Sequence, residues 1–213
     1  MSCLASEEML GCTQCSLHQW RTQVVPGHGD TNAWLACVAE APGAQEDAEG
    51  EPLVGRAGQR FDRHLAAVGL SREEVFLENT VHCRPPNNRL SDYPDALVRC
   101  PPLWLFPTLQ ELPNLRVVVA MGATAGGLWF PGKKAREIAT LARAFLHTAG
   151  AKGYINKMHI ARPYIVVGAW HPSHALRTGG DWNNIDESIV ASFQRALTYG
   201  ALVGVSNGTS NTT

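Results

Sequence analysis

Three separate stretches of the chain concentrate side chains that can do acid–base or hydrogen-bonding chemistry. The first, VAEAPGAQEDAEGEPLVGRAG (residues 38–58), holds four glycines, two prolines and five acids. It is too broken for a helix and too long for a tight turn. The second is NTVHCRPPNNR (residues 79–89), and the third is WHPSHALR (residues 170–177). Loops rich in Asn, His, Glu and Gly suit the wall of one binding or catalytic pocket.

The six cysteines form another group with possible chemistry. Cys12 and Cys15 make a C-x-x-C pair, which favours metal ligands or free thiols over a disulfide scaffold in a chain of this size. Thiolates in tetrahedral geometry suit zinc or an iron–sulfur cluster, and spacing alone does not decide between them. Cys3 is interpreted as a free thiol in a loose terminus, and Cys37 as a buried strand residue.

The elements that must position these residues alternate between strands and helices. Each apolar run ends at one of the polar or glycine-rich loops, as expected for βα units. Ser71 and Glu74 resemble a capping box, and Pro107 should kink or break any helix that contains it. We expect strands at residues 34–40, 75–79, 115–121 and 165–169, and helices at residues 58–69, 122–129 and 185–200.

This alternation predicts an α/β fold, a three-layer α/β/α sandwich with a central four-stranded parallel sheet. Ligands of such sheets bind outside the carboxyl ends of the strands. The three polar loops follow the first, second and fourth predicted strands, so they should converge at that edge. We expect residues 1–203 to form a single domain and residues 204–213, which are polar, to be a disordered tail.

Composition sets limits on function. With 45% hydrophobic and 17% charged residues in 213, the chain can build a sizeable core. No leader-like or membrane-spanning apolar run is evident, so we expect a soluble, cytoplasmic (intracellular) protein that does not bind membranes. The formal net charge is -1, so any contact with nucleic acid must be local. We expect a monomer, and the sequence implies no protein partner.

Four motifs carry a resemblance to a known family. The segments GCTQC, EAPGAQEDAEGEPLVGRAG, ENTVHCRPPNNR and HPSHALR resemble the family 4 uracil-DNA glycosylases, the iron–sulfur branch of the uracil-DNA glycosylase superfamily, from about Leu10 to Leu197. The resemblance implies a monofunctional DNA glycosylase that flips a base out of DNA and hydrolyses its N-glycosidic bond, leaving an abasic site. It also implies a [4Fe-4S] cluster, with zinc as the alternative. Its four ligands would be Cys12, Cys15, Cys83 and Cys100.

The same resemblance implies roles for the loop residues. Asn79 matches the asparagine that reads the base edge, because an amide offers an acceptor and a donor side by side. His171 matches the histidine that hydrogen-bonds the base as negative charge builds there. Backbone N–H groups from Ala41 to Gly43 would add donors. Of the two candidate carboxylates, we expect Glu46 to orient water and Glu40 to brace the loop.

DNA contacts are expected from the second and third loops. Leu176 is the expected apolar wedge, because Ala175 replaces the leucine that is usual four positions after the histidine. Arg177 is expected to contact phosphate, and Arg84 and Arg89 to extend a phosphate track, with Lys133, Lys134, Lys152 and Lys157 either joining it or serving as scattered surface charges.

Two departures from the family bear on the substrate. Leu53 stands where a phenylalanine usually stacks on uracil, and residues 133–163 form a longer connector than usual that lacks its Arg-Gly. Three hypotheses therefore stay open. The excised base is uracil; or it is a bulky modified pyrimidine, such as the glycosylated hydroxymethylcytosine of phage DNA, removed in antiviral defence; or the chain is a catalytically silent DNA-binding module.

Overall fold

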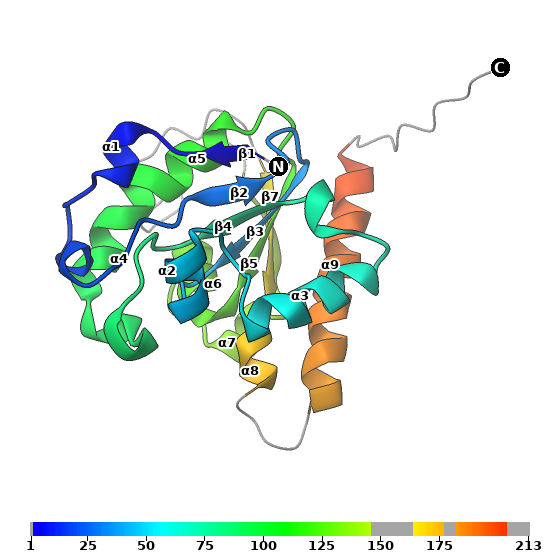
Figure 1. Ribbon diagram of the computed structural model, residues 1–213. Helices are drawn as coiled ribbons and strands as arrows, with labels where there is room; N and C mark the ends of the chain where they lie inside the picture. Colours follow the sequence, from blue (N-terminus) through cyan, green and yellow to red (C-terminus); the bar gives the residue numbers. More distant parts are fainter. Residues whose placement is uncertain (1, 146–163, 177–181, 204–213) are drawn as a thin grey trace.

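The computed structural model describes residues 2–145, 164–176 and 182–203 (Figure 1). The predicted tail at 204–213, Arg177, Lys152, Lys157 and most of the 133–163 connector lie outside the described residues. Among the described residues, no helix combines the length and the apolar character that crossing a bilayer requires.

The centre of the fold is the predicted parallel sheet. It contains β3 (Leu35–Ala39), β4 (Phe76–Asn79), β5 (Val117–Met121) and β7 (Tyr164–Ala169), which are almost entirely buried and apolar. Their spatial order is β4-β3-β5-β7, and every neighbouring pair is parallel. The chain moves to one side of β3 to form β4 and to the other side to form β5. The switch point that attracts ligands in such sheets therefore lies between β3 and β5.

The sheet is larger than the four strands predicted. Three antiparallel strands extend its edges: β1 (Ser2–Leu4), β2 (Gly27–Gly29) and β6 (Ala142–Phe145). They escape prediction because they are three or four residues long, and β2 reads Gly-His-Gly, which has neither alternation nor β propensity. The α/β class is confirmed, with edge strands added.

Helices cover both faces of the sheet, which confirms the three-layer arrangement (Figure 1). Alternate residues of β3 point to opposite faces, as the strand period requires. Ala36 and Val38 pack in the cluster that includes α5 (Phe106–Glu111), α6 (Gly122–Trp129) and α7 (Ala135–Ile138). Leu35, Cys37 and Ala39 pack in the cluster that includes α3 (Arg56–Ala66) and α9 (Trp182–Leu202).

The stretch at residues 38–58 contains a helix, contrary to the prediction. Helix α2 (Ala44–Glu49) begins after Gly43 and ends at Gly50, whose φ of 80° is left-handed. The Glu46 side chain accepts from the Gly43 N–H and closes the first turn. A six-residue helix that depends on one side chain for its start leaves no periodic pattern, which is why the sequence concealed it.

Short helical segments build a smaller region beside the sheet that carries the cysteines. Its core includes Met9, Leu17, Val81 and Ala96. Pro107 lies in the first turn of α5, directly after the π-helical segment, so the chain stays helical there and is not broken at the proline; the kink stays a prediction. The remaining elements are α1 (Glu7–Leu10), η1 (Ser16–Gln19), η2 (Arg72–Glu74), η3 (Pro86–Asn88), η4 (Leu90–Asp92), α4 (Pro94–Cys100), η5 (Pro101–Leu105) and α8 (Pro172–Ala175).

Candidate active site

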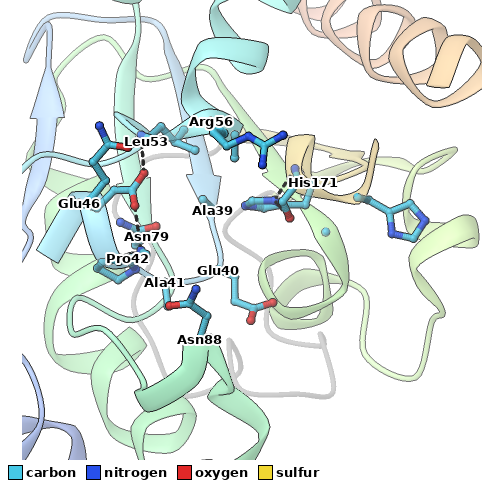
Figure 2. A pocket seen from close by; sticks show the side chains of 18 of the residues that line it. Ala39, Glu40, Ala41, Pro42, Glu46, Leu53, Arg56, Asn79, Asn88 and His171 are labelled. Atoms are coloured by element: carbon cyan, nitrogen blue, oxygen red, sulfur yellow. Dashed lines mark hydrogen bonds between the residues drawn. The ribbon is translucent and has the colours of Figure 1, made fainter. Parts of the chain in front are cut away.

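A cavity of about 530 Å³ opens at the carboxyl ends of the parallel strands (Figure 2). Residues from the loops after all four strands line it, so the predicted convergence of the polar loops is confirmed. The site residues expected from the sequence that line it are Glu40, Ala41, Gly43, Glu46, Leu53, Asn79 and His171.

Glu46 is engaged on both sides of its carboxylate. One oxygen accepts from the Gly43 N–H at 3.0 Å and the other from the Gly55 N–H at 2.9 Å. A Cβ added at Gly43 would lie 2.6 Å from the nearer oxygen, so the glycine is what lets the carboxylate approach. The Gly43 N–H, expected to serve a ligand, is therefore used inside the loop. Figure 2 shows the carboxylate directed at the loop backbone.

Glu40 lies at the switch point between β3 and β5. One of its carboxylate oxygens accepts from the Thr124 hydroxyl at 2.8 Å, which joins the loop after β3 to the start of α6. Among the described residues, no hydrogen bond reaches its second oxygen. Glu40 is half-buried and lines the cavity, with its side chain separated from Glu46 by the loop (Figure 2).

Asn79 ends β4 and is only 3% exposed. Its backbone N–H donates to Oε1 of Glu78 at 2.7 Å, and the following residue, Thr80, donates from both its N–H and its hydroxyl to the Ala39 carbonyl. Among the described residues, no hydrogen bond holds the Asn79 side-chain amide. A fixed backbone thus presents an amide with both its donor and its acceptor available to a ligand.

His171 follows β7 and caps α8. Its Nδ1 accepts from the Ser173 N–H at 3.2 Å and lies 2.8 Å from the Ser173 hydroxyl. Because a backbone N–H can only donate, the ring nitrogen that accepts it carries no proton, and the ring holds its proton at Nε2. Gly122, with φ of 89°, brings the start of α6 against the histidine: a Cβ there would lie 3.1 Å from the His171 Cβ.

Leu53 forms part of the wall and has an unusual backbone. Its φ of 56° is left-handed, a region that costs a leucine about 1–2 kcal/mol. Arg72 holds this conformation by donating to the Leu53 carbonyl, while its guanidinium also pairs with Asp62. A Cβ at Gly58 would lie 1.6 Å from the Leu53 carbonyl oxygen, so α3 can pass there only as glycine. The side chain is 5% exposed and packs beside Phe61.

Several lining residues were not singled out from the sequence. Trp170 and His174 stack with ring centroids 4.6 Å apart at the edge of the cavity, and Asn88 and Arg56 also line it. Arg56 is exposed and lines the same cavity as His171 (Figure 2). Arg56 precedes the predicted helix at residues 58–69 and begins α3 in the structure, a position where a cation is electrostatically unfavourable without a ligand.

Three of the residues expected to contact DNA, Arg84, Arg89 and Leu176, lie in the described part of the second and third loops. Arg84 donates to the Asn88 side chain at 3.1 Å, which places it beside the cavity. Arg89 is exposed next to it, and Leu176 is half-buried at the end of α8. The phosphate contacts of Arg84 and Arg89 and the wedge role of Leu176 stay predictions.

The four cysteines of the motif line one small chamber in the region beside the sheet. Cys83 and Cys100 are buried, and Cys12 and Cys15 are half-buried. Burial raises the pKa of Cys15 and of Cys83 to about 11. Without a bound cation these thiols would therefore stay protonated, and a metal centre would displace the protons.

Nitrogen donors face three of these sulfurs. Trp104 donates to Cys12 at 3.4 Å, Arg21 donates to Cys83 at 3.2 Å, and Nδ1 of His82 lies 3.2 Å from the sulfur of Cys100. Donors of this kind suit thiolates that are metal ligands. Burial opposes a charge on His82, but the neighbouring Glu78 carboxylate and Cys100 sulfur raise its pKa to about 10.

Hydrogen bonds join the segments of the chain that carry the cysteines. Among the described residues, no group of three or more His, Cys, Asp or Glu side chains surrounds a metal-ion position. Ser16, next to Cys15, is fixed to α4 because its N–H and hydroxyl donate to Asp95 at 2.8 and 3.0 Å. The chamber is therefore held together by bonds between the two cysteine-bearing segments.

Comparison with known proteins bears on this geometry. The family model for the uracil DNA glycosylase superfamily matches residues 26–193, a range that includes every parallel strand and the whole pocket. The chain belongs to the uracil-DNA glycosylase superfamily. It is a DNA glycosylase, a hydrolase of N-glycosyl bonds, as the superfamily's resemblance predicted.

Named relatives of the superfamily are similar over most of their length. A type-4 uracil-DNA glycosylase of Thermotoga maritima is 33% identical over 196 residues, which is 92% of this chain and 93% of the relative. A type-4 enzyme of Sulfurisphaera tokodaii is 33% identical, covering 80% of this chain and 73% of its own length. One from Archaeoglobus fulgidus is 41% identical over 124 residues, 58% of this chain and 60% of its own. The superfamily match begins after Cys12 and Cys15 and so does not bear on them.

Proposed function

We propose that the protein removes uracil from DNA by hydrolysing the bond between the base and deoxyribose. The observation that carries this proposal is the meeting of an unengaged amide on Asn79, a proton-bearing Nε2 on His171 and an available oxygen on Glu40 in one cavity. The names of the similar proteins support uracil as the base. Nothing observed favours a bulky modified pyrimidine or a silent binding module.

In this proposal Asn79 reads the base. Its amide carbonyl accepts from N3–H of uracil and its NH2 donates to O4, a pairing that cytosine reverses. Because the Asn79 backbone is fixed by Glu78 and by the Thr80 contact with Ala39, the amide is presented with little freedom. Leu53 forms the wall against which the base packs, in place of an aromatic platform.

Cleavage places the electron pair of the C1′–N1 bond on the departing uracil. His171 stabilises this charge by donating from Nε2 to the base O2, and the Ala41 N–H is available as a second donor. The sugar becomes cationic, and water adds its oxygen to C1′ while its proton passes to a carboxylate. The products are free uracil and an abasic site.

We assign the water-orienting role to Glu40 and the bracing role to Glu46, the reverse of the expectation from sequence. Each Glu46 oxygen already accepts a backbone N–H, so about half of the acceptor sites of this carboxylate hold the loop and its orientation is fixed toward the backbone. Glu40 keeps one oxygen available beside the cavity. The spacing of the two acids in the sequence could not distinguish them, because the difference lies in the hydrogen-bond partners of each carboxylate: two backbone N–H groups at Glu46 and the Thr124 hydroxyl at Glu40.

We further propose that Cys12, Cys15, Cys83 and Cys100 hold a [4Fe-4S] cluster. A zinc ion would need all four thiolates within about 2.3 Å of one point, whereas a cluster spreads them over four iron atoms. A four-iron cluster places iron and sulfide between its thiolates, which suits cysteines that line a chamber. The cluster would tie the N-terminal segment to the loop after β4. Its chemistry would be structural, and no step of base release passes through it.

The test uses DNA duplexes with a single uracil, cytosine or hydroxymethylcytosine at one labelled position. We expect abasic sites, detected by alkaline strand cleavage, at uracil alone. His171→Ala should lower the single-turnover rate by at least about a hundredfold while DNA binding is retained. Cleavage confined to a modified cytosine would replace uracil as the substrate, and no cleavage of any duplex would refute the proposed activity.

A further inference from the structure

The short stretch from Asn79 to Cys83 joins the base pocket to the cysteine chamber. Asn79 lines the base pocket, and Cys83, four residues later, lines the cysteine chamber. Between them the backbone is fixed at each step: the Val81 N–H donates to the Glu40 carbonyl, and the His82 carbonyl accepts from the Val25 N–H at 2.8 Å. A displacement of Cys83 should therefore also displace Asn79, because the hydrogen-bonded backbone between them has little freedom to move.

Two buried side chains add a direct link across this stretch. Glu78 is 0% exposed and His82 is 1% exposed. Nε2 of His82 lies 2.7 Å from Oε1 of Glu78, and Nδ1 of the same ring lies 3.2 Å from the sulfur of Cys100. The same Glu78 oxygen accepts from the Asn79 N–H at 2.7 Å. Three hydrogen bonds thus form a continuous chain from a cysteine of the chamber to the backbone of the residue proposed to read the base.

We propose that His82 and Glu78 are positioning residues that couple the cysteine chamber to base recognition by Asn79. The inference rests on the proposed uracil-releasing function and on the proposed cluster ligands. We call the two residues, with the hydrogen bonds that join them to Cys100 and to the Asn79 N–H, the bridge. Through the bridge, the orientation of Asn79 would depend on the position and charge of the Cys100 sulfur.

The energetics argue against the bridge being ordinary core filling. Oε2 of Glu78 is buried and has no hydrogen-bond partner among the described residues, a situation that costs roughly 1–3 kcal/mol. A well-packed apolar pair of similar volume would avoid this cost. The neighbouring strand makes room for the carboxylate, since a Cβ at Gly27 would lie 2.4 Å from Oε2. Unlike an apolar pair, Glu78 and His82 form hydrogen bonds of fixed geometry, one to the Asn79 N–H and one to the Cys100 sulfur. These bonds fix the orientation of the groups that they join.

The decisive variant is Glu78→Gln, because Glu78 contacts no cysteine. If the bridge couples the two sites, this change must alter the hydrogen bond from His82 to the Cys100 sulfur and also the orientation of Asn79. Two readouts are measured on purified protein with its cluster: the iron–thiolate bands in the resonance Raman spectrum, and the ratio of uracil to cytosine release. We expect shifted iron–thiolate bands and a uracil preference reduced by about tenfold, the scale of one charge-assisted hydrogen bond.

Arg21→Gln is the matched control. It removes a donor to a cysteine sulfur, Cys83, but lies outside the bridge. We expect it to shift the iron–thiolate bands while leaving the uracil-to-cytosine ratio unchanged. Glu78→Gln with unshifted bands, or Arg21→Gln with the same loss of base preference as Glu78→Gln, would overturn the coupling.

The unmodified protein provides a test that does not depend on a variant folding. Coupling between two sites is reciprocal, so a ligand at Asn79 must perturb the chamber as much as the chamber perturbs Asn79. Saturating free uracil, a neutral probe, should shift the iron–thiolate bands, and free cytosine should not. Unchanged bands with bound uracil would refute the bridge. Failure of the proposed activity is distinguished by the duplex assay, since the effect of Glu78→Gln on the bands requires no substrate.

Discussion

Replacing Glu46 by glutamine is the sharpest test of the different roles proposed for Glu46 and Glu40. Glutamine retains one carbonyl oxygen, so one of the two backbone hydrogen bonds is weakened and the other is replaced by an NH2 group that faces an N–H donor. Loss of a hydrogen bond to a charged group costs about 1.5–3 kcal/mol, and a buried donor left unpaired costs about 1–3 kcal/mol more. Glu46 is 9% exposed and the Gly55 contact is buried, so solvent offsets little of this.

We therefore expect Glu46→Gln to lower the free energy of unfolding by about 3 kcal/mol. For a domain of this size that corresponds to a fall in Tm of roughly 6–12 °C. Thermal unfolding followed by circular dichroism measures it directly. Base release should fall as well, because the loop carrying Ala41 loosens, but it should recover in part at low temperature, where the loop is populated in its native form.

Glu40→Gln is the matched comparison. Its one described hydrogen bond is with the Thr124 hydroxyl, which can rotate to accept from an amide as readily as it donates to a carboxylate. We expect Tm to stay within about 2 °C of the unmodified protein, while single-turnover release of uracil falls at least about a hundredfold. The opposite pattern, with Glu46→Gln stable but inactive and Glu40→Gln active, would refute the assignment of roles.

Three further predictions concern Leu53 and Arg56 in the pocket and His64, which joins α3 to α9 through Asp186. Leu53→Phe should raise single-turnover uracil release by up to about tenfold, because an aromatic wall stacks on the base, and unchanged release would show that the side chain belongs to the core alone. Arg56→Ala should weaken DNA binding and lower the dependence of log affinity on log salt by about one unit, as loss of one phosphate contact does, and an unchanged slope would contradict that contact. Burial lowers the pKa of His64 below its usual 6.5 even though Asp186 is its partner, so the unfolded chain binds the proton more readily and stability should fall as pH decreases through and below about 6.5. Denaturant unfolding at about pH 7.5 and pH 5.5 should show this slope in the unmodified protein and not in His64→Gln.

The sequence predicts the parallel sheet and its three polar loops because those features leave local patterns. Residues 115–121 form an apolar run of strand length, and it becomes β5. Asn79 and His171 could be placed in one pocket because each follows or ends a parallel strand, and the carboxyl ends of parallel strands lie at one edge of the sheet. The short edge strands carry no such pattern, since the pairing of β2 depends on the backbone of β4.

Other features depend on contacts that no local pattern records. The roles proposed for Glu40 and Glu46 differ because two backbone N–H groups hold the Glu46 carboxylate, whereas the Thr124 hydroxyl donates to one Glu40 oxygen. The left-handed backbone of Leu53 depends on the hydrogen bond from Arg72 and on the absence of a side chain at Gly58, which the Leu53 carbonyl contacts closely. The same is true of Glu78, which reads in the sequence as an acid within a strand and becomes a buried partner of His82 only when β4 is covered on both faces.

The position of the cysteine chamber along the chain has a consequence for biosynthesis. All four cysteines and the three donors that face them lie between residues 12 and 104, whereas His171 follows the last parallel strand. A ribosome therefore delivers every residue of the chamber before it delivers β7. The cluster proposed for the chamber could therefore be inserted while the nascent chain still lacks His171, the residue proposed to stabilise the departing base, so maturation could precede any capacity to damage DNA.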